Sequence, residues 1–116
     1  MLVGHGSKAR GFDRALRRVE RTLKKERLYF DVRCGFLEAA EPSIPQVIRE
    51  CVERGAKEVR LLPYFVLSGK HVMNDIPRIV ADAAKKYRKD AKIVLCPYLG
   101  YHAKIVSIVK ERLGHG

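Results

Sequence analysis

The run Val59-Arg60-Leu61-Leu62-Pro63-Tyr64-Phe65-Val66 is the most informative segment for the fold. Arg60 is its only charged residue, and a near-continuous apolar stretch of this length is typical of a β-strand covered on both faces. Strands of this kind occur in parallel sheets that have helices packed on each side. The sequence on either side of the run should therefore alternate between strands and helices.

Two strand–helix units precede this run. Residues 2–3 form the end of a first strand, and residues 12–23 repeat apolar side chains at the 3-4-3-4 spacing of a helix. The alternating apolar residues of 30–36 predict a second strand. Ser43 as an N-cap and Gly55 as a stop then bound a second helix.

Two further units include and follow the run. Asp75 is predicted to cap a third helix, which leaves residues 67–74 as a long loop, and residues 93–96 predict a fourth strand. The expected inner side of the third helix is Ile76, Ile79, Val80, Ala83 and Tyr87, and the expected buried face of a last helix is Ile105, Val106, Ile108, Val109 and Leu113. The chain is therefore predicted to be an α/β protein of one domain over residues 1–116, with three layers: a four-stranded parallel sheet and helices on both of its faces.

Composition limits the class of protein. A chain of 116 residues with 47% hydrophobic residues can bury a core without disulfides, and its three cysteines form no CxxC pair, so we expect them to be reduced. No apolar run approaches the ~18 to 20 residues of a membrane span, and no signal peptide is visible, which predicts a cytoplasmic protein. The net charge of +11 favours a polyanionic partner.

Unusual polar residues follow three of the predicted strands. His5 follows the first strand, Glu38 and Glu41 follow the second, and Lys70 and His71 follow the third. Ligands of open parallel sheets bind beyond these carboxyl ends. Two imidazoles and a carboxylate suit divalent Co, Ni, Fe or Zn, and the flanking glycines Gly4, Gly6 and Gly69 would let the backbone approach a flat ligand closely.

Structural explanations for the same residues remain open at this point. A loop histidine is more often a hydrogen-bonded or surface residue than a ligand, and Glu38 and Glu41 could simply favour the start of the second helix. Lys70 could be an isolated surface cation, and His102 is expected to be structural. The GHGS turn lacks the third glycine of a dinucleotide site and no GxxxxGK[ST] loop occurs, so a nucleotide cofactor is not expected.

Four segments together resemble one known family over residues 1–113. The segments are Val3-Gly4-His5-Gly6-Ser7, Phe36-Leu37-Glu38-Ala39-Ala40-Glu41-Pro42-Ser43-Ile44, Leu62-Pro63-Tyr64-Phe65-Val66 and Gly69-Lys70-His71-Val72-Met73-Asn74-Asp75-Ile76-Pro77. In this order they resemble the short-form sirohydrochlorin cobaltochelatases. These small class II chelatases are similar to one lobe of the larger, two-lobed cobalt chelatases and ferrochelatases.

The resemblance implies insertion of a divalent metal into sirohydrochlorin in cobalamin biosynthesis, with the metal as a substrate and no tightly bound cofactor. It implies that His5 is a metal ligand and the proton acceptor, that His71 is the second ligand, and that Glu38 is an acid at the metal. The residues implied to contact the tetrapyrrole are Glu41, Val66, Leu67, Ser68, Gly69, Lys70 and His71. Cobalt is favoured because the stretch 84–90 lacks the histidines of nickel-inserting relatives; the alternatives are nickel or iron insertion, in a nickel-tetrapyrrole or sirohaem pathway.

The expected assembly is a homodimer, because one lobe leaves a tetrapyrrole exposed on one side. Val66, Leu67, Val72 and Met73 are the expected contacts, since the periodicity assigns none of them to the core. No nucleic-acid or membrane partner is expected: a basic nucleic-acid-binding module is favoured by charge alone, without a matching motif. A phosphohistidine enzyme built on His5 would leave the other polar residues unexplained.

Overall fold

The computed structural model describes residues 1–67 and 69–115, except for the side chain of His71. Strands and helices alternate along the chain as predicted. Their bounds are β1 (Leu2–Gly4), α1 (Arg14–Glu26), β2 (Cys34–Phe36), α2 (Ile44–Glu53), β3 (Glu58–Pro63), α3 (Lys70–Lys86), β4 (Lys92–Leu95) and α4 (Ala103–Arg112). None of the helices that the structure describes is long and apolar enough to span a bilayer.

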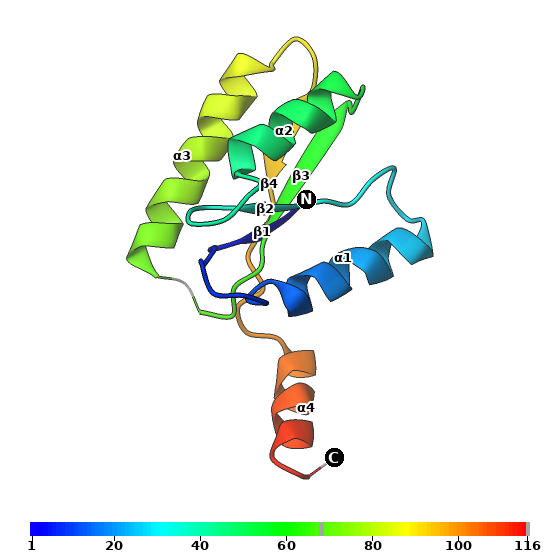
Figure 1. Ribbon diagram of the computed structural model, residues 1–116, viewed down its shortest axis with the longest axis vertical. Helices are drawn as coiled ribbons and strands as arrows, with labels where there is room; N and C mark the ends of the chain where they lie inside the picture. Colours follow the sequence, from blue (N-terminus) through cyan, green and yellow to red (C-terminus); the bar gives the residue numbers. More distant parts are fainter. Residues whose placement is uncertain (68, 116) are drawn as a thin grey trace.

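The strands form one parallel sheet in the order β2-β1-β3-β4. Helix α1 lies on one side of the sheet and helices α2 and α3 lie on the other (Figure 1). This arrangement confirms the three-layer α/β prediction. The chain changes direction across the sheet at β1, since β2 and β3 flank it, and ligands of such sheets bind beyond the strand ends at this point.

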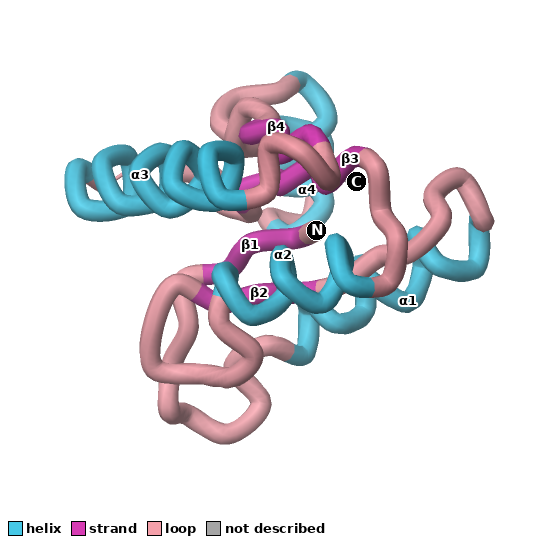
Figure 2. Tube along the Cα trace, turned by 90° about the horizontal axis from the view of Figure 1, so that it is seen from above, coloured by secondary structure: helices cyan, strands magenta, loops and turns pink. Residues whose placement is uncertain are grey.

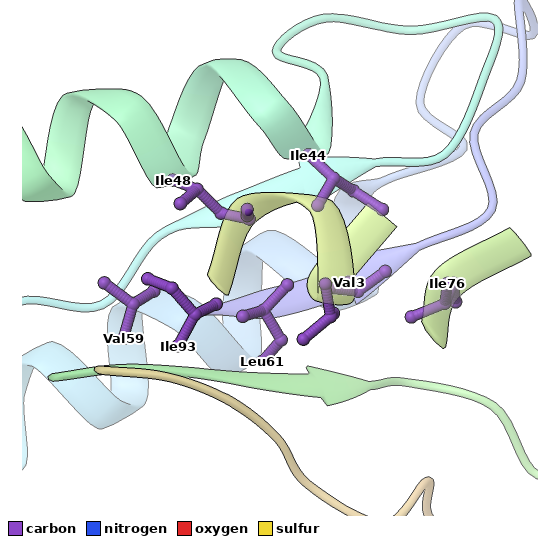
Figure 3. Close-up of a cluster of buried hydrophobic side chains, with 9 residues drawn as sticks. Val3, Ile44, Ile48, Val59, Leu61, Ile76 and Ile93 are labelled. Atoms are coloured by element: carbon purple, nitrogen blue, oxygen red, sulfur yellow. The ribbon is translucent and has the colours of Figure 1, made fainter. Parts of the chain in front are cut away.

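Two apolar clusters hold the layers together. The larger one lies between the sheet and helices α2 and α3, and its buried residues are Val3, Ile44, Ile48, Val59, Leu61, Ile76, Val80, Ala83 and Ile93. Figure 3 shows labelled members of this cluster, among them Val3, Ile48 and Leu61, converging from strands and a helix. The smaller one lies beneath α1 and contains Leu2, Leu16, Val32, Cys34 and Phe36. Val3 and Leu2 point to opposite faces, as neighbours in a strand must, so β1 contributes to both clusters.

The second helix has the ends that the sequence predicts. The Ser43 hydroxyl accepts a hydrogen bond from the Gln46 backbone N–H at 3.3 Å, and Gly55 follows the last turn with a φ of +95°. The second strand is shorter than predicted, because only residues 34–36 pair with β1. Phe30, expected to begin that strand, is 92% exposed.

The third helix begins at Lys70, so the prediction that Asp75 caps it is wrong. Gly69 is the N-cap, and the turns before Asp75 place Val72 one helical repeat ahead of Ile76 and against the larger cluster. The apolar spacing of Val72, Ile76 and Val80 therefore continues the helix through Pro77, although proline removes one helical hydrogen bond. His71 lies in the first turn of α3 and not in a loop.

Two predictions about burial are also wrong. Strand β3 ends at Pro63 and not at Val66. In its first half Glu58 and Arg60 are exposed while Val59 and Leu61 are buried, so this part of the strand is covered on one face and not on both. Helix α4 has the predicted position and apolar residues but no buried residue. It projects away from the sheet beyond the carboxyl ends of the strands (Figures 1 and 2).

Candidate functional site

The turn after β1 and the turn after β2 lie side by side. Gly4 pairs with Phe36 at the end of the two parallel strands. The pairing continues into the turns, because Leu37 N–H donates to the Gly4 carbonyl at 3.0 Å and Glu38 N–H donates to the His5 carbonyl at 2.9 Å. The backbone thus fixes His5 and Glu38 as direct neighbours at the carboxyl edge of the sheet.

The side chains of these two residues are in contact. His5 Nε2 lies 2.7 Å from Glu38 Oε1, and the two side chains are 50% and 53% exposed. An imidazole this close to a carboxylate is held in a defined orientation and can pass a proton to it or receive one from it. The sequence prediction that His5 and Glu38 meet at one edge is therefore confirmed.

Gly6 allows the turn after β1 to lie close to the backbone of Glu38. Its φ is +104°, and a Cβ atom placed on it would lie 1.6 Å from the backbone carbonyl oxygen of Glu38. A Cβ on Gly4 would meet the Phe36 ring at 3.0 Å. Gly4 and Gly6 thus lack a side chain because neighbouring protein atoms occupy the space, whereas a Cβ on Gly69 would enter open space. Of the three glycines singled out for a flat ligand, only Gly69 leaves room outside the protein.

Phe36, the last residue of β2, packs under the turns that carry His5 and Glu38. The sequence alone did not identify the residues that contact its ring. Its buried ring makes a T-shaped contact with the Phe12 ring, at a centroid distance of 5.2 Å and an interplanar angle of 66°. The Arg17 guanidinium lies 5.5 Å from the same ring, and its Nε also donates to Asp13 at 3.2 Å. Phe12 precedes α1 and is not part of it. The only signal in the sequence was the apolar spacing that links Phe12 to the helix.

Glu41 lies in the same turn as Glu38. The chain returns from Phe36 to Ser43 through residues 37–42, and Phe36 N–H donates to the Pro42 carbonyl at 2.9 Å. Ala39 has a φ of +59°, and the Glu41–Pro42 peptide is cis. Glu41 is exposed on the returning arm of this turn.

The third part of the edge follows β3. Val3 pairs with Pro63, and Tyr64 N–H donates to the Val3 carbonyl at 2.8 Å, so the chain from Tyr64 to Leu67 leaves the sheet beside the His5 turn. Val66, Leu67, Gly69 and Lys70 are all exposed, as substrate-contacting residues would be. Ser68 lies outside the described residues. Val72, which was expected at a subunit contact, is partly buried against the core instead, whereas Met73 is exposed.

The structure shows two of the three predicted metal ligands together. His5 and Glu38 supply one imidazole nitrogen and one carboxylate, and the backbone of His71 lies in the first turn of α3. Within the described part of the chain, no group of three or more His, Cys, Asp or Glu side chains is arranged to hold a metal ion. His71 is therefore the position on which a third ligand depends.

An apolar hollow of about 150 Å³ lies near the same edge. It is formed between the first turns of α3 and the chain after β4, and its lining includes Phe65, Met73, Pro77 and Tyr98. Sequence reasoning did not predict it, because its residues are distant along the chain and carry no motif. His102 is a structural residue, as predicted: its Nδ1 accepts a hydrogen bond from Lys104 N–H at 3.0 Å and caps α4.

Comparison with known proteins gives consistent relatives. The chain is 35% identical over 115 residues to the chloroplastic sirohydrochlorin ferrochelatase of Arabidopsis thaliana, covering 99% of this chain and 51% of that protein. It is 36% identical over 80 residues to the sirohydrochlorin cobaltochelatase of Methanocaldococcus jannaschii, covering 69% of this chain and 56% of that protein. The chain thus spans about half the length of these curated relatives.

A solved structure and a family model agree with these relatives. The sirohydrochlorin chelatase SirB from Bacillus subtilis subspecies spizizenii, solved in complex with cobalt, superposes with a TM-score of 0.85 at 28% identity. The superposition covers 97% of this chain and 47% of that one. The family model CbiX matches residues 1–115. The turns that carry His5 and Glu38 lie within that match, and the chain belongs to the CbiX family.

Proposed function

We propose that this protein inserts a divalent metal ion into sirohydrochlorin. The observation that carries the proposal is the contact of 2.7 Å between His5 Nε2 and Glu38 Oε1 at the carboxyl edge of the sheet, in a chain that belongs to the CbiX family. Relatives over nearly the whole chain or most of it are named for the insertion of iron or cobalt into this tetrapyrrole. The half-exposed pair is open to a ligand that arrives from outside the sheet.

The chemistry of metal insertion fits this pair. The reaction removes two protons from pyrrolic nitrogens while the metal passes from protein ligands to the macrocycle. A neutral imidazole is a suitable base near neutral pH, and the carboxylate of Glu38 stabilises the imidazolium that forms when His5 takes a proton. We therefore assign His5 as a metal ligand that becomes the proton acceptor once the metal has passed to the macrocycle, with the second pyrrolic proton going to solvent water, and Glu38 as the acid that orients His5.

His71 is the proposed second ligand. It belongs to the first turn of α3, directly after the segment that leaves β3 beside the His5 turn. A metal held by two imidazoles and a carboxylate retains open positions, so the macrocycle nitrogens can replace the protein ligands one at a time. This ligand set favours late first-row ions over Mg²⁺ or Ca²⁺, which prefer shells of oxygen.

Cobalt is the proposed metal, in a cobalamin pathway. The M. jannaschii relative is named for cobalt, and the SirB structure was solved in complex with cobalt. The A. thaliana relative is named for iron, so iron is the first alternative metal and nickel the second. The ligands His5, Glu38 and His71 would suit all three ions, and an assay with each metal in parallel must decide among them.

The proposed tetrapyrrole surface lies at the same edge. Glu41, Val66, Leu67, Gly69 and Lys70 are exposed there, with the apolar hollow beside Met73 and Tyr98 as a place for part of the macrocycle. Ser68 and His71 are also proposed contacts, on the family resemblance alone. Sirohydrochlorin is a flat polycarboxylate, so an apolar wall and surplus basic charge on the protein both favour its binding. The net charge of +11 supplies that excess.

The proposed working unit is a homodimer. This chain spans about half the length of the curated relatives it matches, and the SirB chain has room for a second lobe of the same size. A second copy would supply the wall that one lobe lacks. Val66, Leu67 and Met73, which are large, apolar and exposed near the site, are the proposed contacts around the shared cleft.

An anaerobic absorbance assay tests the proposed reaction. The purified protein is mixed with sirohydrochlorin and Co²⁺, Fe²⁺ or Ni²⁺ in parallel, and the spectrum of the metallated product is followed against a protein-free control. We expect the protein to accelerate insertion, most strongly with cobalt. Rates equal to the protein-free control with all three metals would overturn the proposed function, and a preference for iron or nickel would change only the metal.

A further inference from the structure

The segment 6–14, which joins β1 to the first residue of α1, carries cations without an acidic partner. Lys8, Arg10 and Arg14 are exposed, and none of them forms an ion pair with another residue of the described chain. Asp13 is the only acid of the segment, and it already accepts a hydrogen bond from Arg17 Nε at 3.2 Å. Three positive charges are therefore available to an anion that arrives from outside.

Contacts near both ends hold the segment at the site. Near its start, Gly6 lies so close to Glu38 that a Cβ atom on Gly6 would be 1.6 Å from the Glu38 carbonyl oxygen. Near its end, the Phe12 ring packs on the Phe36 ring at a centroid distance of 5.2 Å. Figure 1 shows the segment in blue at the end of the sheet where the chain leaves β1. The cations between these contacts are thus held at the carboxyl edge.

Lys8 and Arg10 lie close to the proposed metal site. Lys8 is three residues from His5, so their Cα atoms are at most ~11 Å apart even in an extended chain. The chain turns between Lys8 and Arg10, because Ser7 Oγ accepts a hydrogen bond from Ala9 N–H at 3.0 Å. The long side chains of both cations add to this reach. A ligand centred on the His5 turn would therefore have its rim near them.

Arg14 folds back over the same segment. A Cβ atom placed on Gly11 would lie 3.2 Å from a guanidinium nitrogen of Arg14 and 3.7 Å from the central guanidinium carbon. The guanidinium thus lies beside the Gly11 backbone, as expected from the lean of helical side chains toward the helix N-terminus. It takes this position although no carboxylate of the described chain pairs with it there.

The proposed substrate needs positive charge at its rim. Sirohydrochlorin carries its carboxylates around the edge of the macrocycle, away from the central nitrogens that receive the metal. The turn next to His5 carries Glu38 and Glu41, whose negative charges disfavour the approach of these carboxylates. Cations beside the metal site, and not at it, would offset this repulsion.

We propose that Lys8, Arg10 and Arg14 bind carboxylates at the rim of the tetrapyrrole while its centre lies over the metal site. The inference rests on the proposed function and adds a group of residues outside the tetrapyrrole surface proposed above. A guanidinium can bind a carboxylate through two parallel hydrogen bonds, and an ammonium acts as a compact charge with three donors. These three residues would thus favour tetrapyrroles with many carboxylates over less acidic porphyrins.

Equilibrium binding of metal-free sirohydrochlorin, followed anaerobically by absorbance, tests the proposal without turnover. Lys8→Gln, Arg10→Gln and Arg14→Gln should each weaken the affinity about threefold to tenfold at low salt, and the triple variant at least ~30-fold. The difference from wild type should shrink in 1 M salt, where the Debye length is ~3 Å. Circular dichroism verifies that each variant is folded, which we expect because all three side chains are exposed.

Arg21→Gln and Lys25→Gln are the matched controls, because each removes the same charge from an exposed position of α1. Arg21 is seven residues after Arg14, so it lies on the same face of the helix and ~10 Å farther along its axis. Lys25 lies one turn beyond Arg21 on that face, farther still from the His5 turn. We expect both controls to bind sirohydrochlorin within about twofold of the wild type.

The outcomes separate this inference from the proposed function. Losses confined to the three variants of segment 6–14 would support the inference. Equal losses in these variants and in the two controls would overturn it, because net charge alone would then explain binding, and wild-type affinity in the triple variant would overturn it as well. A wild type that does not bind sirohydrochlorin at all would instead overturn the proposed function on which the inference rests.

Discussion

Replacing Gly6 with alanine tests the backbone geometry on which the His5–Glu38 pair depends. The new Cβ atom would lie 1.6 Å from the Glu38 carbonyl oxygen, so the two turns must separate by more than about 1 Å to reach a van der Waals contact. That movement breaks the hydrogen bond of 2.9 Å from Glu38 N–H to the His5 carbonyl. The variant also keeps alanine at a φ of +104°.

The expected cost follows from these two effects. A positive φ costs a residue with a side chain ~1 to 2 kcal/mol, and loss of a backbone hydrogen bond between two exposed residues adds ~0.5 to 1.5 kcal/mol. We therefore expect Gly6→Ala to lower the free energy of unfolding by roughly 1.5 to 3.5 kcal/mol. Gly55→Ala is the matched control, because Gly55 has a φ of +95° and a Cβ atom placed on it would meet no atom within 4 Å, so only the ~1 to 2 kcal/mol of backbone strain applies.

Urea unfolding followed by circular dichroism measures both variants, since the chain has no tryptophan. The metal-insertion assay then compares their rates at a temperature where each is folded. We expect Gly6→Ala to lose most of its insertion rate and Gly55→Ala to retain it. If the two variants are equally stable and equally active, the Gly6 contact does not hold the site together, and the reasoning from the backbone is refuted.

Three further predictions concern the site, the surface charge and the core. His5→Ala and His71→Ala should each reduce the insertion rate at least tenfold without lowering the melting temperature by more than a few degrees. Glu38→Gln should slow turnover more than it changes stability. Full activity in His71→Ala would remove His71 from the set of metal ligands. The apparent affinity for sirohydrochlorin should fall with ionic strength as charges are screened over a Debye length of ~8 to 10 Å; salt-independent affinity beside tight binding to random duplex DNA would favour a nucleic-acid module instead. Burial raises the pKa of the Cys34 thiol to about 12 from its ordinary 9.0, so the unfolded state loses this proton first as pH rises. Between pH 8 and 10 the wild type should therefore lose ~1.4 kcal/mol more unfolding free energy than Cys34→Ala. Equal losses in the two proteins would show that Cys34 does not titrate in this way.

The sequence predicts most of the fold because its apolar spacing is set by local geometry. The alternation of strand and helix periods identifies all four strand–helix units, and Ser43 and Gly55 mark the ends of α2 correctly. The start of α3 was misplaced because Asp75 is a good capping residue by type. The structure instead continues the helix toward Gly69, where burial of Val72 outweighs the preference for a cap at Asp75.

The errors elsewhere have a common physical cause. Periodicity shows that one face of a helix or strand is apolar, but it does not show which surface covers that face. The apolar residues of α4 were therefore assigned to the core of the same chain, although the helix projects away from it. The same limit applies to the site: strand ends placed His5 near Glu38, whereas the role of Gly6 depends on a backbone contact that no sequence pattern reports.

Cobalt K-edge X-ray absorption on the Co²⁺-loaded protein tests the proposed metal site most directly, because it counts imidazole ligands without requiring turnover. We predict two imidazoles and one carboxylate per cobalt in the wild type, and one imidazole after either His5→Ala or His71→Ala. Glu38→Gln should retain both imidazoles while losing the carboxylate. An unchanged imidazole count in His5→Ala would contradict the assignment of the His5–Glu38 pair as the centre of a metal-insertion site.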